Sequence, residues 1–101
     1  MLDKWDKLTI AVRELSSRLL IGTGKFSSPQ LMKAAVDSAG SEIVTVAVRR
    51  TDLSSVEDSF IKWIDPKQYL FLPNTSGART ADDAIKIAEI ARFSGVSDWV
   101  K

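Results

Sequence analysis

The sequence predicts an α/β protein built on a parallel sheet. Short apolar, β-branched segments alternate with segments whose apolar residues recur at helical spacing, and the core strands begin roughly every 25–30 residues. Residues with capping and turn preferences stand between these segments. Two architectures fit this alternation, an open doubly wound sheet or one half of a (β/α)₈ barrel, and the periodicity does not choose between them.

Strands are expected at residues 8–12 and 18–21, and residues 13–17 between them are expected to turn a hairpin. Residues 1–7 are expected to be a flexible N-terminus. A helix should follow, because Ser28 can cap it, Pro29 suits its first position and Gly40 can end it in the left-handed conformation. The run at 43–48 is β-branched and almost wholly apolar, which is typical of a strand buried on both faces.

The remaining elements repeat this alternation. A helix is expected to begin near Ser54 or Ser55, with Asp58 completing a capping box, and to end at Asp65 before Pro66. A third buried strand is expected at 69–72, and Pro73 should close it. Thr80 and Asp83 form a second capping box, and the helix after them should end at Gly95. Residues 98–101 read as the beginning of a fourth strand.

The composition limits the classes of function. The chain has 101 residues, of which 45% are hydrophobic and 27% charged, so a small folded domain is expected. A net charge of +1 predicts no nucleic-acid or anionic-membrane partner. Because the chain has no Cys and no His, disulfides, Cys/His zinc sites, and thiol or imidazole catalysis are excluded within it. No apolar run approaches the ~20 residues of a membrane span, and no signal peptide is evident, so a cytoplasmic protein is expected.

Polar residues follow the predicted core strands, at the sheet edge where α/β proteins bind ligands. Gly24 and Lys25 could form an anion cradle before a helix, or a tight turn only. Arg49 and Arg50 could clamp a phosphate or carboxylate, or form an ion pair at the strand end. Asn74 and Thr75 could belong to a substrate loop, or serve the turn alone.

Lys101 is the remaining candidate. A lysine at this position is most simply a solvated surface residue, but strand alternation puts Trp99 and Lys101 on one face and Val100 on the other. If that face lines a barrel, the amine is placed to attack a carbonyl and form a Schiff base. With no His or Cys in the chain, this lysine is the candidate for covalent catalysis.

Four segments in order resemble one family. They are residues 17–25 (SRLLIGTGK), 42–50 (EIVTVAVRR), 72–75 (LPNT) and 98–101 (DWVK). Together they resemble bacterial and plastid thiazole synthase, the ThiG family of thiamine biosynthesis, over nearly the whole chain after about residue 8. The alternatives are half of another Schiff-base or phosphate-binding (β/α)₈ enzyme, or a stand-alone small α/β binding module.

The resemblance implies a (β/α)₈ TIM barrel opened by an N-terminal hairpin. Residues 1–101 would then be a single partial domain, the hairpin and about the first half of a barrel of roughly 250 residues. The family condenses 1-deoxy-D-xylulose 5-phosphate with dehydroglycine and sulfur from the thiocarboxylate of the carrier protein ThiS. Its Schiff-base lysine falls on Lys101.

The resemblance also carries expectations about partners. It implies no cofactor, homo-oligomers of the full-length protein, and association in some organisms with the enzyme that produces dehydroglycine. The carboxylates that move protons and the phosphate-binding loops of the family would lie beyond Lys101, so the 101-residue chain alone is expected to be inactive.

Overall fold

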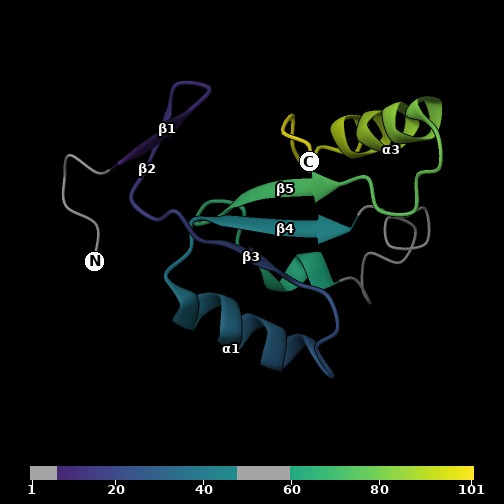
Figure 1. The fold of residues 1–101 in the computed structure, drawn as a ribbon. Coiled ribbons are helices and arrows are strands. Elements are labelled where there is room, and N and C mark those ends of the chain that lie inside the picture. The colour runs from purple at the N-terminus through teal and green to yellow at the C-terminus, as the bar shows by residue number, and fades with distance from the viewer. Residues whose placement is uncertain (1–6, 48–59) are drawn as a thin grey trace.

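The computed structural model describes residues 7–47 and 60–101. Their elements are β1 (Leu8–Ile10), β2 (Arg13–Leu15), β3 (Leu20–Gly22), α1 (Pro29–Ala39), β4 (Ile43–Ala47), the 3-10 helix η2 (Phe60–Trp63), β5 (Leu70–Asn74) and α3 (Ala81–Phe93). Strands β3, β4 and β5 form a parallel sheet in that order, and β1 and β2 form a separate hairpin (Figure 1). The predicted α/β class with a parallel sheet is confirmed.

The position of the hairpin turn differs from the prediction. β1 pairs with β2, so residues 13–15 form a strand, and the turn lies at Ala11 and Val12. Both turn residues have positive φ, 49° and 63°, as in the two-residue turns that match the twist of a hairpin. Left-handed backbone costs alanine or valine about 1–2 kcal/mol per residue, and neither residue type signals such a turn. The predicted turn at 13–17 is therefore wrong.

Strand β3 belongs to the parallel sheet. Leu20 lies opposite Ile43 and Gly22 opposite Thr45, in parallel register. This pairing confirms the strand–helix–strand alternation from residue 18 onward, but the expected pairing of residues 18–21 with 8–12 is wrong. The intervening helix is bounded as predicted: the Ser28 hydroxyl accepts a hydrogen bond from the Leu31 N–H, and Gly40 has a φ of 70°.

Two later elements differ in detail. The expected helix from Ser54 to Asp65 begins outside the described residues, and its described part contains the short 3-10 helix η2. Asp58, Val48 and residues 1–6, which also carried predictions, lie outside the described residues. Strand β5 runs through Pro73 to Asn74 rather than ending at residue 72.

Before α3, the Thr80 hydroxyl accepts a hydrogen bond from the Asp83 N–H as predicted. The Asp83 carboxylate accepts one from the Arg79 N–H.

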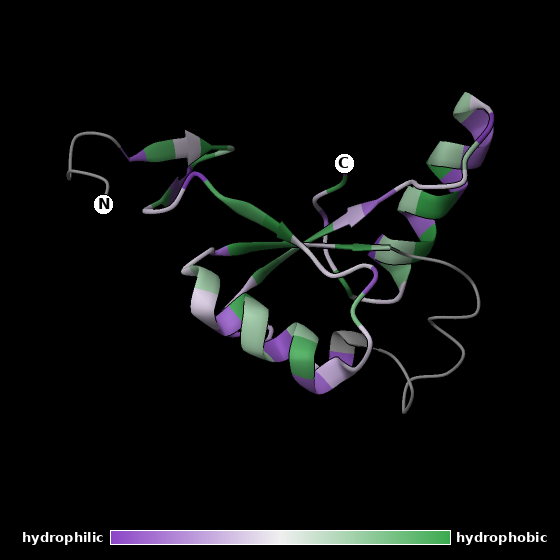
Figure 2. Cartoon of the chain, turned by 60° about the horizontal axis from the view of Figure 1, so that its bottom comes forward, coloured by the Kyte–Doolittle hydropathy of each residue, from purple (hydrophilic) through white to green (hydrophobic). Residues whose placement is uncertain are grey.

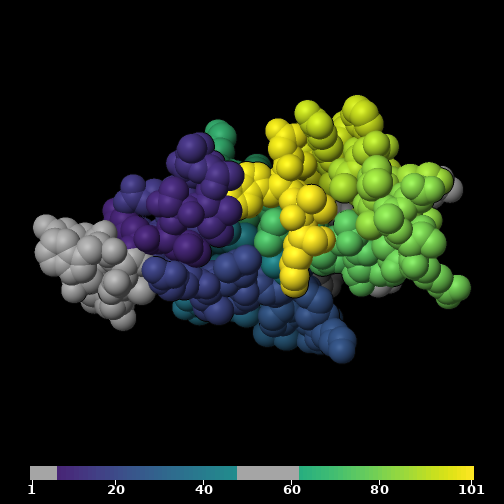
Figure 3. Space-filling model, turned by 45° about the horizontal axis from the view of Figure 1, so that its top comes forward, coloured from purple at the N-terminus to yellow at the C-terminus, as the bar shows by residue number. Residues whose placement is uncertain are grey.

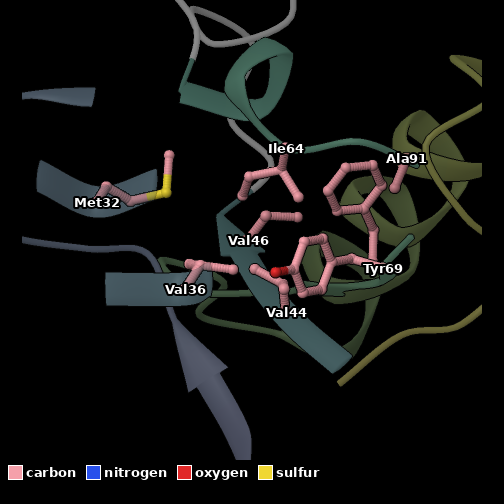
Figure 4. Packing of buried hydrophobic residues seen from close by; sticks show 8 residues of the cluster. Met32, Val36, Val44, Val46, Ile64, Tyr69 and Ala91 are labelled. Atoms are coloured by element: carbon pink, nitrogen blue, oxygen red, sulfur yellow. The ribbon is translucent and has the colours of Figure 1, made fainter. Parts of the chain in front are cut away.

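One side of the sheet, which we call the helix face, carries the main core. Val44 and Val46 of β4 and Phe71 of β5 are buried here. The residues that cover them come from α1, α3 and the segment around η2, namely Met32, Val36, Ile64, Tyr69 and Ala91 (Figure 4). This packing explains why both β4 residues on this face, Val44 and Val46, are apolar.

The opposite side, which we call the hairpin face, is covered at one end only. The hairpin lies at the end where the strands begin (Figure 1). Its Leu15 is fully buried against Ile43 and Leu72. Glu42 anchors the segment after the hairpin, because its carboxylate accepts hydrogen bonds from the N–H groups of Ser16 and Ser17. Figure 2 shows the hairpin and the chain end across the sheet from α1.

Within the described ranges, no helix combines the length and apolar character needed to cross a membrane.

Candidate functional site

Lys101 is held beside the carboxyl end of β5. Its backbone N–H donates to the carbonyl oxygen of Pro73 at 2.8 Å, and its carbonyl accepts from the Thr75 N–H at 3.2 Å. In a pair of parallel strands, the N–H and C=O of one residue bond to the two residues that flank its partner. Lys101 is therefore paired with Asn74, and the chain enters alongside β5 in the direction predicted for a fourth strand.

Pro73 explains why this pairing starts only at Lys101, rather than at Asp98 as expected. In a parallel ladder the N–H and C=O of one residue face the same neighbouring strand. The Pro73 carbonyl faces Lys101, so the N–H that proline lacks would have faced the same side. The Trp99 carbonyl therefore meets no donor from residue 73. The Trp99 N–H donates to the Ser97 hydroxyl within its own segment.

The hairpin face changes character along the strands. At the amino ends it presents a row of three apolar side chains, Leu20, Ile43 and Leu70. At the carboxyl ends the row consists of Ala47, Asn74 and Lys101, since residues paired in a parallel ladder share a face. The site therefore opens where the hairpin no longer covers the sheet.

Trp99 lies on the hairpin face. Its side chain packs against the hairpin-face cluster of Leu15, Ile43 and Leu72. Figure 3 shows the chain end, in yellow, beside the hairpin, in purple. Alternation then places Lys101 on the same face as Trp99, which agrees with its pairing to Asn74. Below the lysine, this face thus presents the apolar Leu72 and Trp99 beside Thr45.

Asn74 and Thr75 take different roles around Lys101. The Asn74 side-chain oxygen accepts a hydrogen bond from the Ser76 N–H at 3.0 Å, which closes an Asx turn. Thr75 holds the Lys101 backbone through its N–H, and its hydroxyl lies 3.5 Å from the same carbonyl oxygen. Both predicted residues are therefore brought to Lys101.

Gly24 and Lys25 lie at the same end of the sheet but farther across it. They follow β3, and β4 and β5 separate β3 from Lys101, a distance of about 14 Å at normal strand spacing. Lys25 is exposed and has a φ of 66°, and a Cβ at Gly24 would meet no atom within 4 Å. The structure does not bring this pair to the lysine. Arg49 and Arg50 lie outside the described residues.

Two threonines were missed by the sequence reasoning. The Thr23 hydroxyl donates to the Thr45 carbonyl oxygen at 2.9 Å and ties the end of β3 to β4. Thr45 itself occupies the middle row of the hairpin face, opposite Gly22 and Leu72. Its alternation with Val44 and Val46 was the available signal, because a polar residue inside an apolar strand marks the less covered face.

Within the described part of the chain, shifted pKa values occur away from this site. The Tyr69 hydroxyl donates to the Asp37 carboxylate at 2.7 Å, and that bond, with burial, raises the pKa of Tyr69 to about 12. Hydrogen bonds from Lys33 and Tyr69 lower the pKa of Asp37. Both groups tie α1 to the start of β5.

The geometry defines an α/β protein whose parallel strands follow one another in sequence order, with a lysine and an amide at their carboxyl ends. The family model for thiazole biosynthesis protein ThiG matches residues 9–101. The chain belongs to this family.

Curated relatives agree with the family match. The chain is 54% identical over 96 residues to thiazole synthase 1 of Syntrophotalea carbinolica, and 54% identical over 94 residues to thiazole synthase of Syntrophobacter fumaroxidans. It is 52% identical over 96 residues to thiazole synthase of Moorella thermoacetica. These alignments cover 93–95% of this chain, and the chain spans 37% of the length of each relative.

Proposed function

We propose that this chain supplies the first strands and the imine-forming lysine of a thiazole synthase with a (β/α)₈ barrel. The order of the strands supports the barrel. β3, β4 and β5 are neighbours in sequence order, and the chain then pairs beside β5. A doubly wound sheet reverses direction and places a later strand beside the first, whereas a barrel continues in one direction. Residues 1–101 form one partial domain of this barrel.

The observation that carries the proposal is the position of Lys101 on the hairpin face, paired with Asn74 at the carboxyl end of the sheet. Its amine attacks the C2 ketone of 1-deoxy-D-xylulose 5-phosphate, and the resulting carbinolamine loses water to form an imine. The protonated imine withdraws electrons from the neighbouring carbon and eases its loss of a proton. The isomerised sugar phosphate then accepts sulfur from the ThiS thiocarboxylate and condenses with dehydroglycine to give a thiazole phosphate carboxylate.

The other site residues are proposed in two groups. Asn74 and Thr75 bind the substrate near its reacting carbonyl. Asn74 is the pairing partner of Lys101, and the Thr75 N–H donates to the Lys101 carbonyl oxygen. Gly24 and Lys25 suit the distant phosphate end of the substrate, because they lie at the same sheet edge across β4 and β5. Arg49 and Arg50 are proposed for the same anion on their residue type alone.

The whole enzyme is proposed to use more than this chain contains. The proton-transferring carboxylates and further phosphate contacts come from the rest of a full-length family member, so residues 1–101 alone are inactive. The full-length protein is a cytoplasmic homo-oligomer that binds ThiS and receives dehydroglycine from a partner enzyme. It needs no cofactor of its own, because the lysine supplies the covalent chemistry.

Borohydride trapping tests this function. Residues from this chain replace the matching 96-residue segment of the Syntrophotalea carbinolica enzyme, which is 54% identical to it. With 1-deoxy-D-xylulose 5-phosphate, reduction is expected to leave one stable adduct on Lys101, found by peptide mass spectrometry. Lys101→Arg should abolish it. Lys86→Arg, on the exposed side of α3, is the matched control and should leave the adduct unchanged.

An unmodified Lys101 in a folded chimera would overturn the proposal. An adduct formed with other ketones but not with this sugar phosphate would favour a different Schiff-base enzyme of the same architecture.

A further inference from the structure

We propose that Asn74 is a specificity-determining residue for the ketone that Lys101 captures. Its side-chain N–H group donates a hydrogen bond to the oxygen on the carbon next to the carbonyl, and so selects α-hydroxyketones over simple ketones. The inference rests on the proposed function, because it assumes that Lys101 forms the imine.

The backbone places the two side chains together. Lys101 is bonded to the residues on both sides of Asn74, through the Pro73 carbonyl and the Thr75 N–H. Paired residues of neighbouring strands share a face and lie about 4.8 Å apart. A ketone joined to the lysine amine therefore lies on the face that carries the Asn74 amide.

Only one half of that amide is free to bind a ligand. Its oxygen already accepts the Ser76 N–H at 3.0 Å, which fixes the side chain by a hydrogen bond to its own loop. The amide nitrogen carries two donors and no acceptor. Asn74 thus presents N–H groups to the site, which match a hydroxyl or carbonyl oxygen of the substrate.

The surroundings of Asn74 offer few competing groups. On the β4 side its partner in the row is Ala47, whose side chain is a methyl group. The row below contains Leu72, which is apolar, and Thr45, whose hydroxyl donates to the Ile21 carbonyl oxygen at 3.5 Å, and the apolar Trp99 packs against Leu72. Thr75 contacts the Lys101 backbone rather than this row. Among the described residues, Asn74 is therefore the polar side chain that lies in the same row as the lysine.

This arrangement predicts discrimination by one hydroxyl. A bound ketone that lacks the neighbouring oxygen leaves the amide donors without a partner, which costs the free energy of one hydrogen bond. A neutral hydrogen bond of this kind corresponds to a preference of about tenfold.

The test compares two ketones at one lysine. The chimera described above is trapped with borohydride using 1-deoxy-D-xylulose 5-phosphate or its 3-deoxy analogue, which lacks the hydroxyl next to the ketone. We expect the unsubstituted chimera to form the Lys101 adduct about tenfold faster with the hydroxylated ketone. Because both ketones react with the same amine, the ratio of the two rates cancels any change in the reactivity of the lysine itself.

Two variants then remove the donors. Asn74→Asp keeps an oxygen for the Ser76 N–H, so the Asx turn is preserved, but it has no N–H group. Asn74→Ala removes the whole amide. In both variants the rate ratio is expected to fall to about one, and the fall in Asn74→Asp separates donor loss from loss of the turn. An unchanged ratio in both variants overturns the role of Asn74 while leaving the proposed function intact. A missing Lys101 adduct with either ketone in the unsubstituted chimera overturns the proposed function itself, and this inference with it.

Discussion

The two faces of the sheet use the same three strands but differ in how far they are covered. On the helix face, Val44 and Val46 are at most 2% exposed, and helical segments cover the strands along their length. On the hairpin face, Ile43 is equally buried near the hairpin, but Ala47 and Asn74 at the other end are only partly buried. The hairpin face is thus closed at the amino ends and accessible at the carboxyl ends.

This difference divides the residues of one five-residue strand between the core and the surface that leads to the candidate site. In β4, alternate residues point to opposite faces, so Val44 and Val46 build the core while Ile43, Thr45 and Ala47 form a graded surface. Ala47 and Asn74, which lie nearest the candidate site, are not part of the main core cluster. Substitutions on the helix face should therefore affect folding, whereas substitutions at the carboxyl ends should affect the proposed reaction first.

The largest effect is expected on the helix face. Phe71→Ala removes a buried ring from the centre of the main core and leaves a cavity, which should lower the free energy of unfolding by about 3–5 kcal/mol. Urea denaturation of the chain, followed by tryptophan fluorescence, measures this change. The matched control is Phe93→Ala at the end of α3, where the ring is 85% exposed, and its effect should stay within about 0.5 kcal/mol. Equal effects at the two positions would contradict the assignment of the core.

A smaller loss is expected under the hairpin. Leu15 is fully buried against Ile43 and Leu72, so Leu15→Ala should cost about 2–4 kcal/mol if the hairpin is part of the folded unit. Leu19→Ala, at a position 52% exposed, is the control and should cost less than about 1 kcal/mol. The same urea measurement applies. A loss below 1 kcal/mol at Leu15 would show that the hairpin does not stabilise the sheet.

Local signals predicted the elements that depend on neighbouring residues only. The start and end of α1 follow from Ser28, Pro29 and Gly40, whose capping and φ preferences act within one turn of helix. The hairpin was misplaced because its turn uses Ala11 and Val12 against their preferences. Burial of Leu15 on the sheet offsets that cost, and a contact of this kind is invisible to local pattern.

The candidate site was predictable in composition but not in register. Alternation alone placed Lys101 and Trp99 on one face, and the sheet edge where Asn74 and Thr75 gather follows from parallel topology. The pairing of Lys101 with Asn74 depends on how α3 returns the chain to β5, and on the donor that Pro73 lacks. Neither is encoded within a few residues of the lysine.

The smallest effect is expected where the helix face meets α1. Tyr69 donates a hydrogen bond to Asp37, and its pKa is raised from 10.0 to about 12, so the folded state holds this proton more tightly than the unfolded state. The stabilisation is therefore fully present below pH 10 and is lost as the pH rises from 10 to 12. Tyr69→Phe should remove this pH dependence and lower the free energy of unfolding at neutral pH by about 1 kcal/mol.

The chain contains one tyrosine, so its ultraviolet absorbance titration reports this group alone. We expect the folded chain to titrate near pH 12 and the urea-unfolded chain near pH 10, with urea denaturation at several pH values giving the matching loss of stability. Asp37→Ala is the control, since it removes the acceptor of the hydroxyl together with its negative charge, and should return the titration toward pH 10. A folded chain that titrates near pH 10 without substitution would show that the bond to Asp37 does not hold the start of β5 against α1.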